Sequence, residues 1–353
     1  MKITRYEAAS YGGPITPQVR ELPDPTGTEV LVEISHCGVC HTDVHVHHGS
    51  YDLGAGRSLS FAERGIQPPL VLGHEIVGRP VASGPNAEVE LNTPHAVYPW
   101  IGCGGCGRCE QGLDHLCAQG AFLGVFRPGG YATHVLVPHP RYLFSVDGLD
   151  PASAALFGCS GLTCFSALQR IAAVPKDAAI AVIGCGGLGL TAIALARQLG
   201  RNRIVAVDPA PDKRALATAA GACAALDSTA LDASAMNAAS GAPILAVLDF
   251  VGSEASSSLA TEAMAKGGTL VVIGLFGGEL RYPLPLLPIR ALTIVGSYVG
   301  SPKELGDYIA HVRRYGAPQV PVFERSFDEA GEVLSELARG EIPGRAVLVH
   351  SKC

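Results

Sequence analysis

The sequence predicts an α/β protein of two domains, one a doubly wound parallel sheet and the other mostly β. Three observations lead to this prediction. The chain of 353 residues is long enough for two domains of about 100–200 residues each. From Pro175 onward, apolar strand-like runs alternate with helical segments, which is typical of a parallel sheet covered by helices on both faces. Before that point, short alternating runs separated by Pro and Gly indicate a mostly-β region.

Composition narrows the class of protein. Hydrophobic residues make up 48% of the chain and the mean hydropathy is +0.27, which suits a well-buried α/β protein. A net charge of -6 and a pI near 6.0 give no basic patch, so we expect no nucleic-acid partner. No apolar run reaches the roughly 18 residues of a membrane span, and residues 1–15 lack the apolar core of a signal peptide. We therefore expect a cytoplasmic protein with no membrane partner.

A run rich in cysteine and histidine follows the first strands. Residues 1–35 read as short strands, and Glu29–Ser35 alternates like a half-buried one. It leads into residues 36–45, where Cys40, Thr42 and His45 place a thiol, a hydroxyl and an imidazole within six residues. This combination suits a metal ligand with a proton path beside it. The alternative is a Cys-x-x-Cys redox pair, or two buried thiols.

A second candidate ligand interrupts an apolar run. Residues 46–69 are predicted to form a long polar loop, with His47 and His48 on the surface. The run at 70–78 then contains Gly-His-Glu, with His74 and Glu75. Burying an imidazole and a carboxylate is costly unless they are paired or bind a metal. The alternative for His74 is a core histidine with satisfied hydrogen bonds.

Four cysteines lie close together after Trp100, in the order Cys103-x2-Cys106-x2-Cys109-x7-Cys117. Such spacing lets four thiolates enclose one tetrahedral zinc ion, and a closed site of this kind is structural. The segment is rich in glycine and has little core of its own, so the metal would supply its folding energy. Two local disulfides are the alternative, and a reducing compartment disfavours them.

The remaining elements follow in order. Gly129–Pro138 is predicted as a strand, and Ala152–Leu168 contains Cys159 and Cys164, of which the spacing selects neither as a ligand. Further strands are predicted at Ala179–Ile183, Arg203–Val207, Leu245–Phe250, Thr269–Ile273, Leu292–Ser297 and Gly344–Val349. Helices are predicted at 187–199, 211–220, 254–265, 302–315 and 326–339.

A glycine-rich turn joins the first strand and helix of the alternating region. Gly184, Gly186 and Gly189 have the G-x-G-x-x-G spacing of a dinucleotide-binding Rossmann fold. The apolar run that follows ends in Asp208, 19 residues beyond Gly189, where an acid binds the ribose hydroxyls of NAD and repels the 2′-phosphate of NADP. The chain has 43 glycines, so a purely structural turn is the alternative.

Taken together, these motifs resemble the zinc-dependent alcohol dehydrogenases of the medium-chain dehydrogenase/reductase superfamily, the bacterial and archaeal members most of all. Five motifs occur in family order over nearly the whole chain. The resemblance implies a GroES-like, mostly-β catalytic domain formed by residues 1–152 and 290–353, with a structural-zinc lobe at about 98–118. A Rossmann domain at 153–289 is inserted between them and binds NAD.

The resemblance also implies roles for single residues. A catalytic zinc is held by Cys40, His74 and Cys159, and Asp43 and Glu75 lie near it. Thr42 takes the substrate proton and His45 passes it outward. A second, structural zinc is held by Cys103, Cys106, Cys109 and Cys117, which makes two Zn per subunit.

The remaining residues implied by the resemblance bind the cofactor or the substrate, or are free thiols. The cofactor is expected to contact Thr163, Gly184, Gly186, Gly187, Leu188, Gly189, Asp208, Lys213, Leu275 and Arg345. The substrate pocket is expected to be lined by Tyr51, Trp100, Phe122, Val125, Leu275 and Tyr298. Free thiols are expected at Cys37, Cys164, Cys185, Cys223 and Cys353.

The expected function is reversible hydride transfer between a hydrophobic alcohol, aromatic or cyclic, and NAD, giving an aldehyde or ketone. A polyol or sugar dehydrogenase of the same superfamily is the alternative, although such enzymes commonly have a carboxylate at the position of Cys159. A non-catalytic protein on this scaffold would be expected to lack a ligand or a relay residue, and all are present. The resemblance further implies a homotetramer or homodimer, which the apolar strand at Leu292–Ser297 could join.

Overall fold

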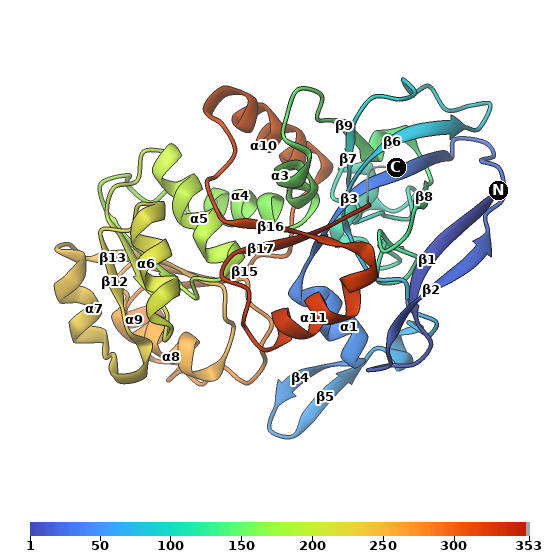
Figure 1. The fold of residues 1–353 in the computed structure, drawn as a ribbon. Coiled ribbons are helices and arrows are strands. Elements are labelled where there is room, and N and C mark those ends of the chain that lie inside the picture. The colour runs from blue at the N-terminus through green and yellow to red at the C-terminus, as the bar shows by residue number, and fades with distance from the viewer. Residues whose placement is uncertain (351–353) are drawn as a thin grey trace.

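The computed structural model describes residues 1–350, and the predicted free thiol Cys353 lies outside that range. Two large sheets organise the chain, one with seven strands and the other with six. Figure 1 shows the yellow and orange elements of the six-stranded sheet on one side and the blue strands of the seven-stranded sheet on the other. The predicted α/β class, with a mostly-β part and a parallel part, is confirmed.

The seven-stranded sheet brings the two ends of the chain together. Its central strand β3 (Val30–Val39) pairs antiparallel with β6 (Glu75–Ser83) and with β17 (Arg345–Val349). In this register Gly38 lies opposite Glu75, so two of the predicted site motifs are neighbours across the sheet. The other strands are β7 (His95–Val97), β8 (His134–Val137), β9 (Leu143–Ser145) and β16 (Val322–Ser326).

The six-stranded sheet is parallel throughout and has the order β12-β11-β10-β13-β14-β15. The strands are β10 (Ala179–Ile183), β11 (Ile204–Val207), β12 (Ala224–Leu226), β13 (Ile244–Asp249), β14 (Thr269–Val272) and β15 (Thr293–Gly296). The chain reverses its direction of winding between β10 and β13, and such a switch point leaves a crevice at the carboxyl ends of the strands. Because β15 belongs to this sheet, the parallel region extends past the predicted domain boundary at residue 290.

Helices cover the parallel sheet and fill the space between the sheets (Figure 1). The α-helices are α1 (His41–His48), α2 (Gly107–Glu110), α3 (Pro151–Ala155), α4 (Ser160–Arg170), α5 (Gly187–Gln198), α6 (Pro211–Ala220), α7 (Ala233–Ser240), α8 (Glu254–Ala263), α9 (Leu286–Ile289), α10 (Pro302–Tyr315) and α11 (Ala330–Ala338). Short 3-10 turns are η1 (Ala62–Arg64), η2 (Asp114–Leu116), η3 (Pro140–Tyr142), η4 (Leu156–Gly158), η5 (Ser228–Ala230) and η6 (Phe327–Glu329).

The segment after α1 differs from its prediction as a long loop. It forms a hairpin of β4 (Ser50–Gly54) and β5 (Arg57–Ser60), whose turn has positive φ at Gly54, Ala55 and Gly56. Polar strands of four or five residues carry no clear alternation, so the sequence alone did not indicate them. His48 is exposed, as predicted, whereas His47 is half-buried, and its Nε2 atom lies 2.7 Å from the carbonyl oxygen of Gly13.

A second hairpin, β1 (Lys2–Ala8) with β2 (Ile15–Glu21), lies at the N-terminus. The strand predicted over Gly129–Pro138 is shorter in the structure, where β8 covers His134 to Val137 and Ala132 forms an isolated bridge with Arg5.

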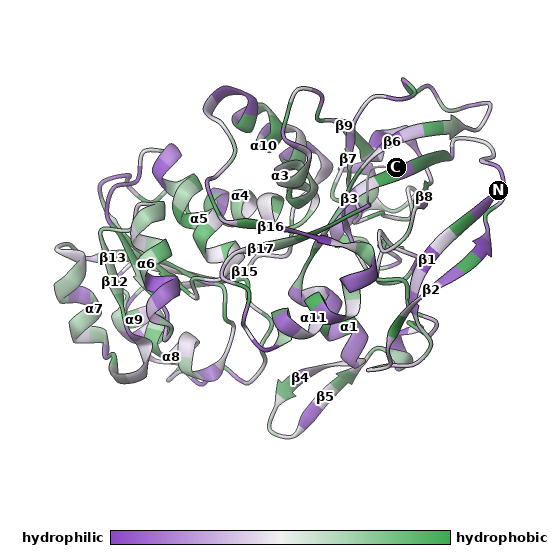
Figure 2. Ribbon diagram, in the orientation of Figure 1, coloured by the Kyte–Doolittle hydropathy of each residue, from purple (hydrophilic) through white to green (hydrophobic). Residues whose placement is uncertain are grey.

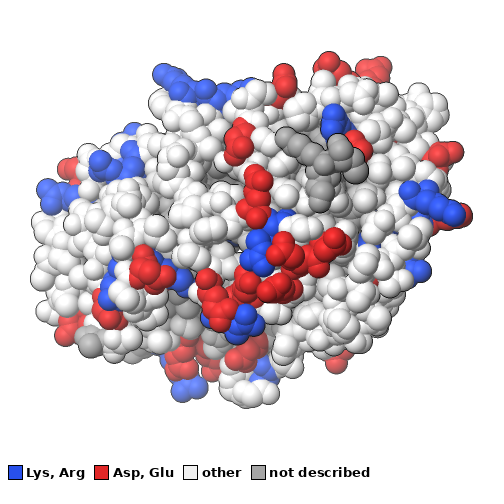
Figure 3. Space-filling model, in the orientation of Figure 1, with Lys and Arg blue, Asp and Glu red and all other residues white. Residues whose placement is uncertain are grey.

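Apolar side chains lie along the parallel strands and along α4 and α5, as the green ribbon of Figure 2 shows, and every residue of β10 is buried. Figure 3 shows acidic and basic side chains intermixed on the viewed face. Arg325 pairs with Glu329 at 2.9 Å and with Glu336 at 3.1 Å. Within residues 1–350, no single helix is both long and apolar enough to cross a bilayer. Residues Pro151–Gly158 and Ser160–Arg170 meet that test only as a pair, bent by 55°.

Candidate active site

Three segments that are distant in the sequence bring Cys40, His74 and Cys159 together. Cys40 ends β3 and caps α1, His74 immediately precedes β6, and Cys159 links η4 to α4. Their ligand atoms lie within 4.8 Å of one another, and the two sulfurs are 4.0 Å apart. All three side chains are buried, so the trio is set by the packed core around it.

A carboxylate orients the imidazole of His74. Asp43, which is fully buried in α1, accepts a hydrogen bond from Nδ1 of His74 at 3.1 Å. It also accepts from the backbone N–H groups of Gly73 and Cys40, at 3.0 and 2.9 Å, so one carboxylate ties two of the segments together. This is the geometry by which a ligand histidine is held in one tautomer, with its other nitrogen free to bind.

That other nitrogen supports the expectation of a metal. Nε2 of His74 is buried and has no hydrogen-bond partner among the described residues. An unsatisfied polar atom in a core costs about 1–3 kcal/mol, which a ligand bond would offset. Two sulfurs and one imidazole nitrogen form the donor set of zinc sites that keep a fourth position open. The residues therefore fit a zinc ion.

The two cysteines of the trio are hydrogen-bonded to each other. A hydrogen bond from the Cys159 thiol lowers the pKa of Cys40 well below its ordinary value, and the same bond raises the pKa of Cys159. The pair is therefore prepared to hold one thiolate before any metal is bound, which is the ligand form that zinc requires.

Glu75 and Arg345 form a buried ion pair beside the trio. Nη2 of Arg345, at the start of β17, donates to Oε2 of Glu75, whose Oε1 accepts from the N–H of Ser160 at 3.0 Å. Burial raises the pKa of Glu75 to about 7, and the charge of Arg345 opposes that rise. A Cβ at Gly38 would lie 2.0 Å from Glu75, and one at Gly187 would lie 2.2 Å from Arg345, so both glycines make room for the pair.

Arg345, which is expected to contact the cofactor, therefore also has a partner within the protein. Its Nε atom is buried without a partner among the described residues, and its side chain passes the glycine turn at Gly187. Arg345 therefore joins the turn, the C-terminal strand and the trio.

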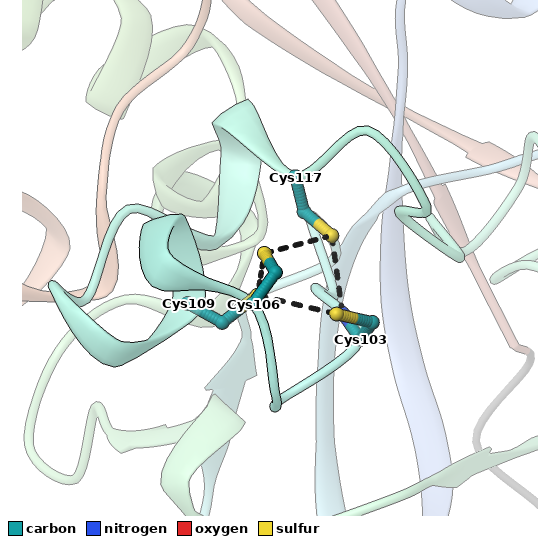
Figure 4. Close-up of side chains that lie close together, drawn as sticks. All are labelled: Cys103, Cys106, Cys109 and Cys117. Atoms are coloured by element: carbon teal, nitrogen blue, oxygen red, sulfur yellow. Dashed lines mark hydrogen bonds between the residues drawn. The ribbon is translucent and has the colours of Figure 1, made fainter.

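The four-cysteine lobe forms a separate cluster, shown in Figure 4, where the four side chains face one another. The Sγ atom of Cys106 lies 3.6 Å from that of Cys109 and 3.8 Å from that of Cys117. The Sγ atoms of Cys103 and Cys109 are 4.0 Å apart. A zinc ion with bonds of about 2.3 Å to sulfur spaces its ligands by about 3.8 Å, which matches these distances. They exclude the disulfide alternative in this structure, since that bond needs about 2.05 Å.

Local contacts hold the lobe in shape. Hydrogen bonds with the backbone and the side chain of Cys109 lower the pKa of Cys106 to about 7. A Cβ at Gly102 would lie 2.4 Å from the Cys109 sulfur, so a glycine is needed there. Asp114 accepts from both Arg141 and Tyr142, at 2.7 and 2.8 Å, and anchors the lobe to the sheet.

The glycine turn lies at the switch point of the parallel sheet. Gly184 has φ +88, which favours glycine, and a Cβ at Gly189 would lie 1.8 Å from the Gly184 carbonyl. Gly186 caps α5 and has open space where a side chain would be. An open backbone at a helix N-terminus is a cradle for phosphate, so the residues fit a dinucleotide.

Asp208 stands beside this turn at the end of β11. Its Oδ2 accepts from the N–H of Cys185 at 2.8 Å, and its Oδ1 accepts from that of Ala210 at 2.9 Å. Each oxygen keeps a lone pair for a further donor. The carboxylate is thus held rigidly toward the cavity that the turn lines.

One cavity of about 410 Å³ contains the trio's sulfurs and the glycine turn. Of the predicted residues it is lined by Cys40, Thr42, His45, Trp100, Cys159, Thr163, Gly184, Gly186, Gly187, Leu188, Gly189, Asp208, Lys213, Leu275, Tyr298 and Arg345. Asp43, His74 and Glu75 are fully buried.

A second cavity of about 310 Å³ shares Thr42, Leu275 and Tyr298 with the first. It brings together the predicted pocket residues Tyr51, Phe122, Val125, Leu275 and Tyr298. The indole of Trp100 packs between them and the trio, with its ring 5.3 Å from that of His74 and 5.4 Å from that of Phe122.

Several lining residues were not predicted. Phe250 and Ile273 follow the ends of β13 and β14, the place where ligands bind in parallel sheets, so strand position was a usable signal. His41 lies in the cysteine- and histidine-rich run that the sequence singled out. Phe61, Arg64 and Phe126, which line the second cavity, come from segments with no motif, and no sequence signal marked them.

Comparisons with known proteins agree with this geometry. Residues 26–147 match the alcohol dehydrogenase GroES-like domain, and residues 187–314 match the zinc-binding dehydrogenase family. An NAD-dependent alcohol dehydrogenase of Sulfurisphaera tokodaii is 31% identical over 341 residues, covering 96% of this chain and 97% of its own. An L-galactonate-5-dehydrogenase of Escherichia coli (strain K12) is 32% identical over 288 residues, covering 81% and 80%.

Among solved structures, the alcohol dehydrogenase of Aeropyrum pernix superposes with a TM-score of 0.87 at 27% identity, covering 98% of this chain and 99% of its own. Both family models and relatives above 30% identity thus span most of the sequence. The chain therefore belongs to the zinc-dependent alcohol dehydrogenases of the medium-chain dehydrogenase/reductase superfamily.

Proposed function

We propose that this protein catalyses reversible hydride transfer between a hydrophobic primary or secondary alcohol and NAD, giving an aldehyde or ketone. The observation that carries the proposal is the trio of Cys40, His74 and Cys159, in which Nε2 of His74 has no partner among the described residues. The trio lies next to a cavity that is also lined by the glycine turn expected to bind the dinucleotide. Zinc, when held by this trio, supplies a Lewis acid that lowers the pKa of a hydroxyl and polarises a carbonyl. NAD, when bound along the turn, supplies the hydride acceptor.

The chain's own residues position the reactants and move the proton. Thr42 and His45 lie three residues apart on α1, on the same side of the helix, and both line the cavity. Burial, and then the neighbouring His41, lower the pKa of His45, so its imidazole is neutral and can accept a proton near pH 7. Thr42 takes the substrate proton, and His45 passes it to solvent.

The choice of NAD follows from Asp208. Its carboxylate offers acceptors to two ribose hydroxyls and repels a 2′-phosphate, whereas Lys213 lines the same cavity and reaches the adenosine ribose. The same cavity is also lined by Thr163, Leu188 and Leu275, which are proposed to contact the cofactor.

The lining of the second cavity supports the proposed substrate class. Aromatic and branched side chains form its wall, which favours an aromatic or cyclic alcohol over ethanol. The runner-up is a polyol or sugar dehydrogenase, favoured by the similarity to the L-galactonate enzyme. Polyols need several buried hydrogen-bonding partners, whereas most side chains of this wall are aromatic or aliphatic.

The four-cysteine lobe is proposed to hold a second, structural zinc, with all four positions occupied by Cys103, Cys106, Cys109 and Cys117. The protein is further proposed to form a homotetramer or homodimer. Apolar side chains at the edge of the parallel sheet support this, because Leu284, Ile289 and Ile294 near β15 are 78%, 61% and 36% exposed.

The test of the reaction is NAD reduction, followed by absorbance, with ethanol, 1-hexanol, cyclohexanol, benzyl alcohol, 1-phenylethanol and sorbitol. Each alcohol is tested with and without a zinc chelator and again with NADP. Chelator-sensitive oxidation of the apolar alcohols with NAD is the expected result. Oxidation of sorbitol alone would favour the runner-up, and no oxidation by zinc-replete protein would refute the proposed reaction.

A further inference from the structure

The second cavity contains a charge that the proposed reaction does not use. Arg64 ends η1 and lines the cavity together with the aromatic residues Tyr51, Phe122 and Tyr298. Across the described chain, no aspartate or glutamate lines this cavity, so Arg64 is its one permanently charged residue. A cavity lined mostly by aromatic and branched aliphatic side chains thus has a guanidinium in its wall.

This guanidinium lacks a protein counter-ion. Among residues 1–350, no ion pair and no side-chain hydrogen bond involves Arg64, and its recorded contact is the ring of Phe126, 5.8 Å from the guanidinium carbon. By contrast, Arg57 in the adjacent hairpin pairs with Glu279 at 2.7 Å, and the buried Arg345 pairs with Glu75. The donors of Arg64 are therefore available to a ligand.

The cavity connects this charge to the trio. Burial, followed by the charge at Cys40, raises the pKa of Tyr51 to about 12, whereas the charge of Arg64 opposes that rise. Burial likewise raises the pKa of Tyr298, where Cys159 and Arg64 again act in opposite directions. Both phenols are thus within electrostatic reach of the trio and of Arg64.

We propose that Arg64 binds a carboxylate at the end of the substrate remote from its hydroxyl. The preferred substrate class is then an aromatic or cyclic alcohol, or the matching aldehyde or ketone, that also carries an acid group. The aromatic wall contacts the body of the substrate, Thr42 lies at the hydroxyl end, and the fork of N–H donors on Arg64 receives the acid. This inference rests on the proposed function, because it names the substrate class of that same reaction.

A direct binding measurement tests the inference without relying on turnover. Trp100 is the chain's one tryptophan, and its ring lies 5.4 Å from that of Phe122 and 5.7 Å from that of Tyr298. Its fluorescence therefore reports on ligands in the cavity. Zinc-replete protein is titrated with benzyl alcohol and with 4-(hydroxymethyl)benzoate, which differ only in the acid group.

The variants are R64Q, R64K and, as a matched control, R79Q. Arg79 lies on β6, is solvent-exposed beside Glu33 at 3.8 Å, and does not line the cavity. The wild type is expected to bind the acid about 10-fold more tightly than benzyl alcohol at low salt, with a smaller preference at high salt. R64Q is expected to lose this preference, R64K to keep part of it, and R79Q to match the wild type. Unchanged binding of benzyl alcohol by R64Q shows that the cavity has kept its shape.

The inference would be overturned if R64Q bound the acid as tightly as the wild type. It would also be overturned if R79Q lost the preference for the acid to the same extent as R64Q. Parallel measurement of kcat/KM separates this failure from that of the reaction. If benzyl alcohol is oxidised but Arg64 makes no difference to the acid, the reaction stands and the inference fails. If neither alcohol is oxidised but the acid binds in an Arg64-dependent way, the reaction fails and the assignment of Arg64 as a carboxylate-binding residue stands.

Discussion

The two cysteine sites of this protein are built in opposite ways. The trio comes from three segments, with Cys40 and Cys159 separated by 119 positions, and it is enclosed by the core. The lobe comes from one short segment, and its first cysteine, Cys103, is exposed. The trio offers three ligand atoms and the lobe four.

Under the proposed function, the trio would hold a catalytic metal and the lobe a structural one. The trio's geometry is held by β3, β6 and α4 and by hydrogen bonds to Asp43, so the protein can fold around it before any metal binds. The lobe has only short turns, α2 and η2, and a small set of contacts through Asp114. Metal binding is then a large part of its folding energy. Four variants test this contrast, and they follow from the largest expected effect on activity to the smallest.

Removing a ligand of the trio should abolish activity and leave the fold intact. We expect C159A to lower kcat/KM by more than about 1,000-fold, since a catalytic metal contributes several kcal/mol to the transition state. Elemental analysis should find one zinc per chain, still held by the lobe, and the far-UV circular dichroism should match the wild type. Full activity in C159A would remove the trio from the mechanism.

Replacing Asp43 should have a smaller effect of the same kind. D43N keeps the side chain's shape but replaces a carboxylate oxygen by an amide group, so the tautomer of His74 is no longer fixed. Loss of such a partner costs about 10–100-fold in metal affinity or activity. Zinc affinity is measured by competition with a chelator. An unchanged affinity would show that the core alone holds His74 in place.

A change of coenzyme preference should leave both cysteine sites unaffected. We expect D208S to weaken NAD binding by about 10-fold and to improve use of NADP, because the ribose loses an acceptor and the 2′-phosphate loses a repelling charge. The measurement is kcat/KM for each coenzyme. The zinc content of D208S should stay at two per chain, and loss of zinc would mean that the turn and the trio are coupled through Arg345.

Removing a ligand of the lobe should affect stability more than chemistry. We expect C106S to lose one zinc per chain and to become sensitive to proteolysis within residues 98–118, while molecules that remain folded keep a kcat within about 10-fold of the wild type. Limited proteolysis with mass spectrometry locates the cleavage, and active-site titration corrects the kcat. A loss of activity as large as that of C159A, in protein that resists proteolysis, would contradict a purely structural role.

The sequence by itself determined whatever depends on residues close together in the chain. The alternation of strands and helices predicted the α/β class, and α6 begins and ends where its pattern indicated. The spacing of Cys103 to Cys117 predicted one cluster, because four cysteines on a short segment can reach a common centre. The turn at Gly184 was likewise readable, since its requirement for glycine is local.

Only the tertiary structure decided what depends on register and packing between distant segments. The residue pattern left Cys159 and Cys164 equivalent, and the fold brings Cys159 to the trio while the Cys164 thiol donates to the Leu188 carbonyl at 3.1 Å. The pairing of Arg345 with Glu75 crosses 270 residues, and Arg64 lines the second cavity from a turn without any motif. Such contacts depend on how sheets and helices pack in space, which local spacing does not encode.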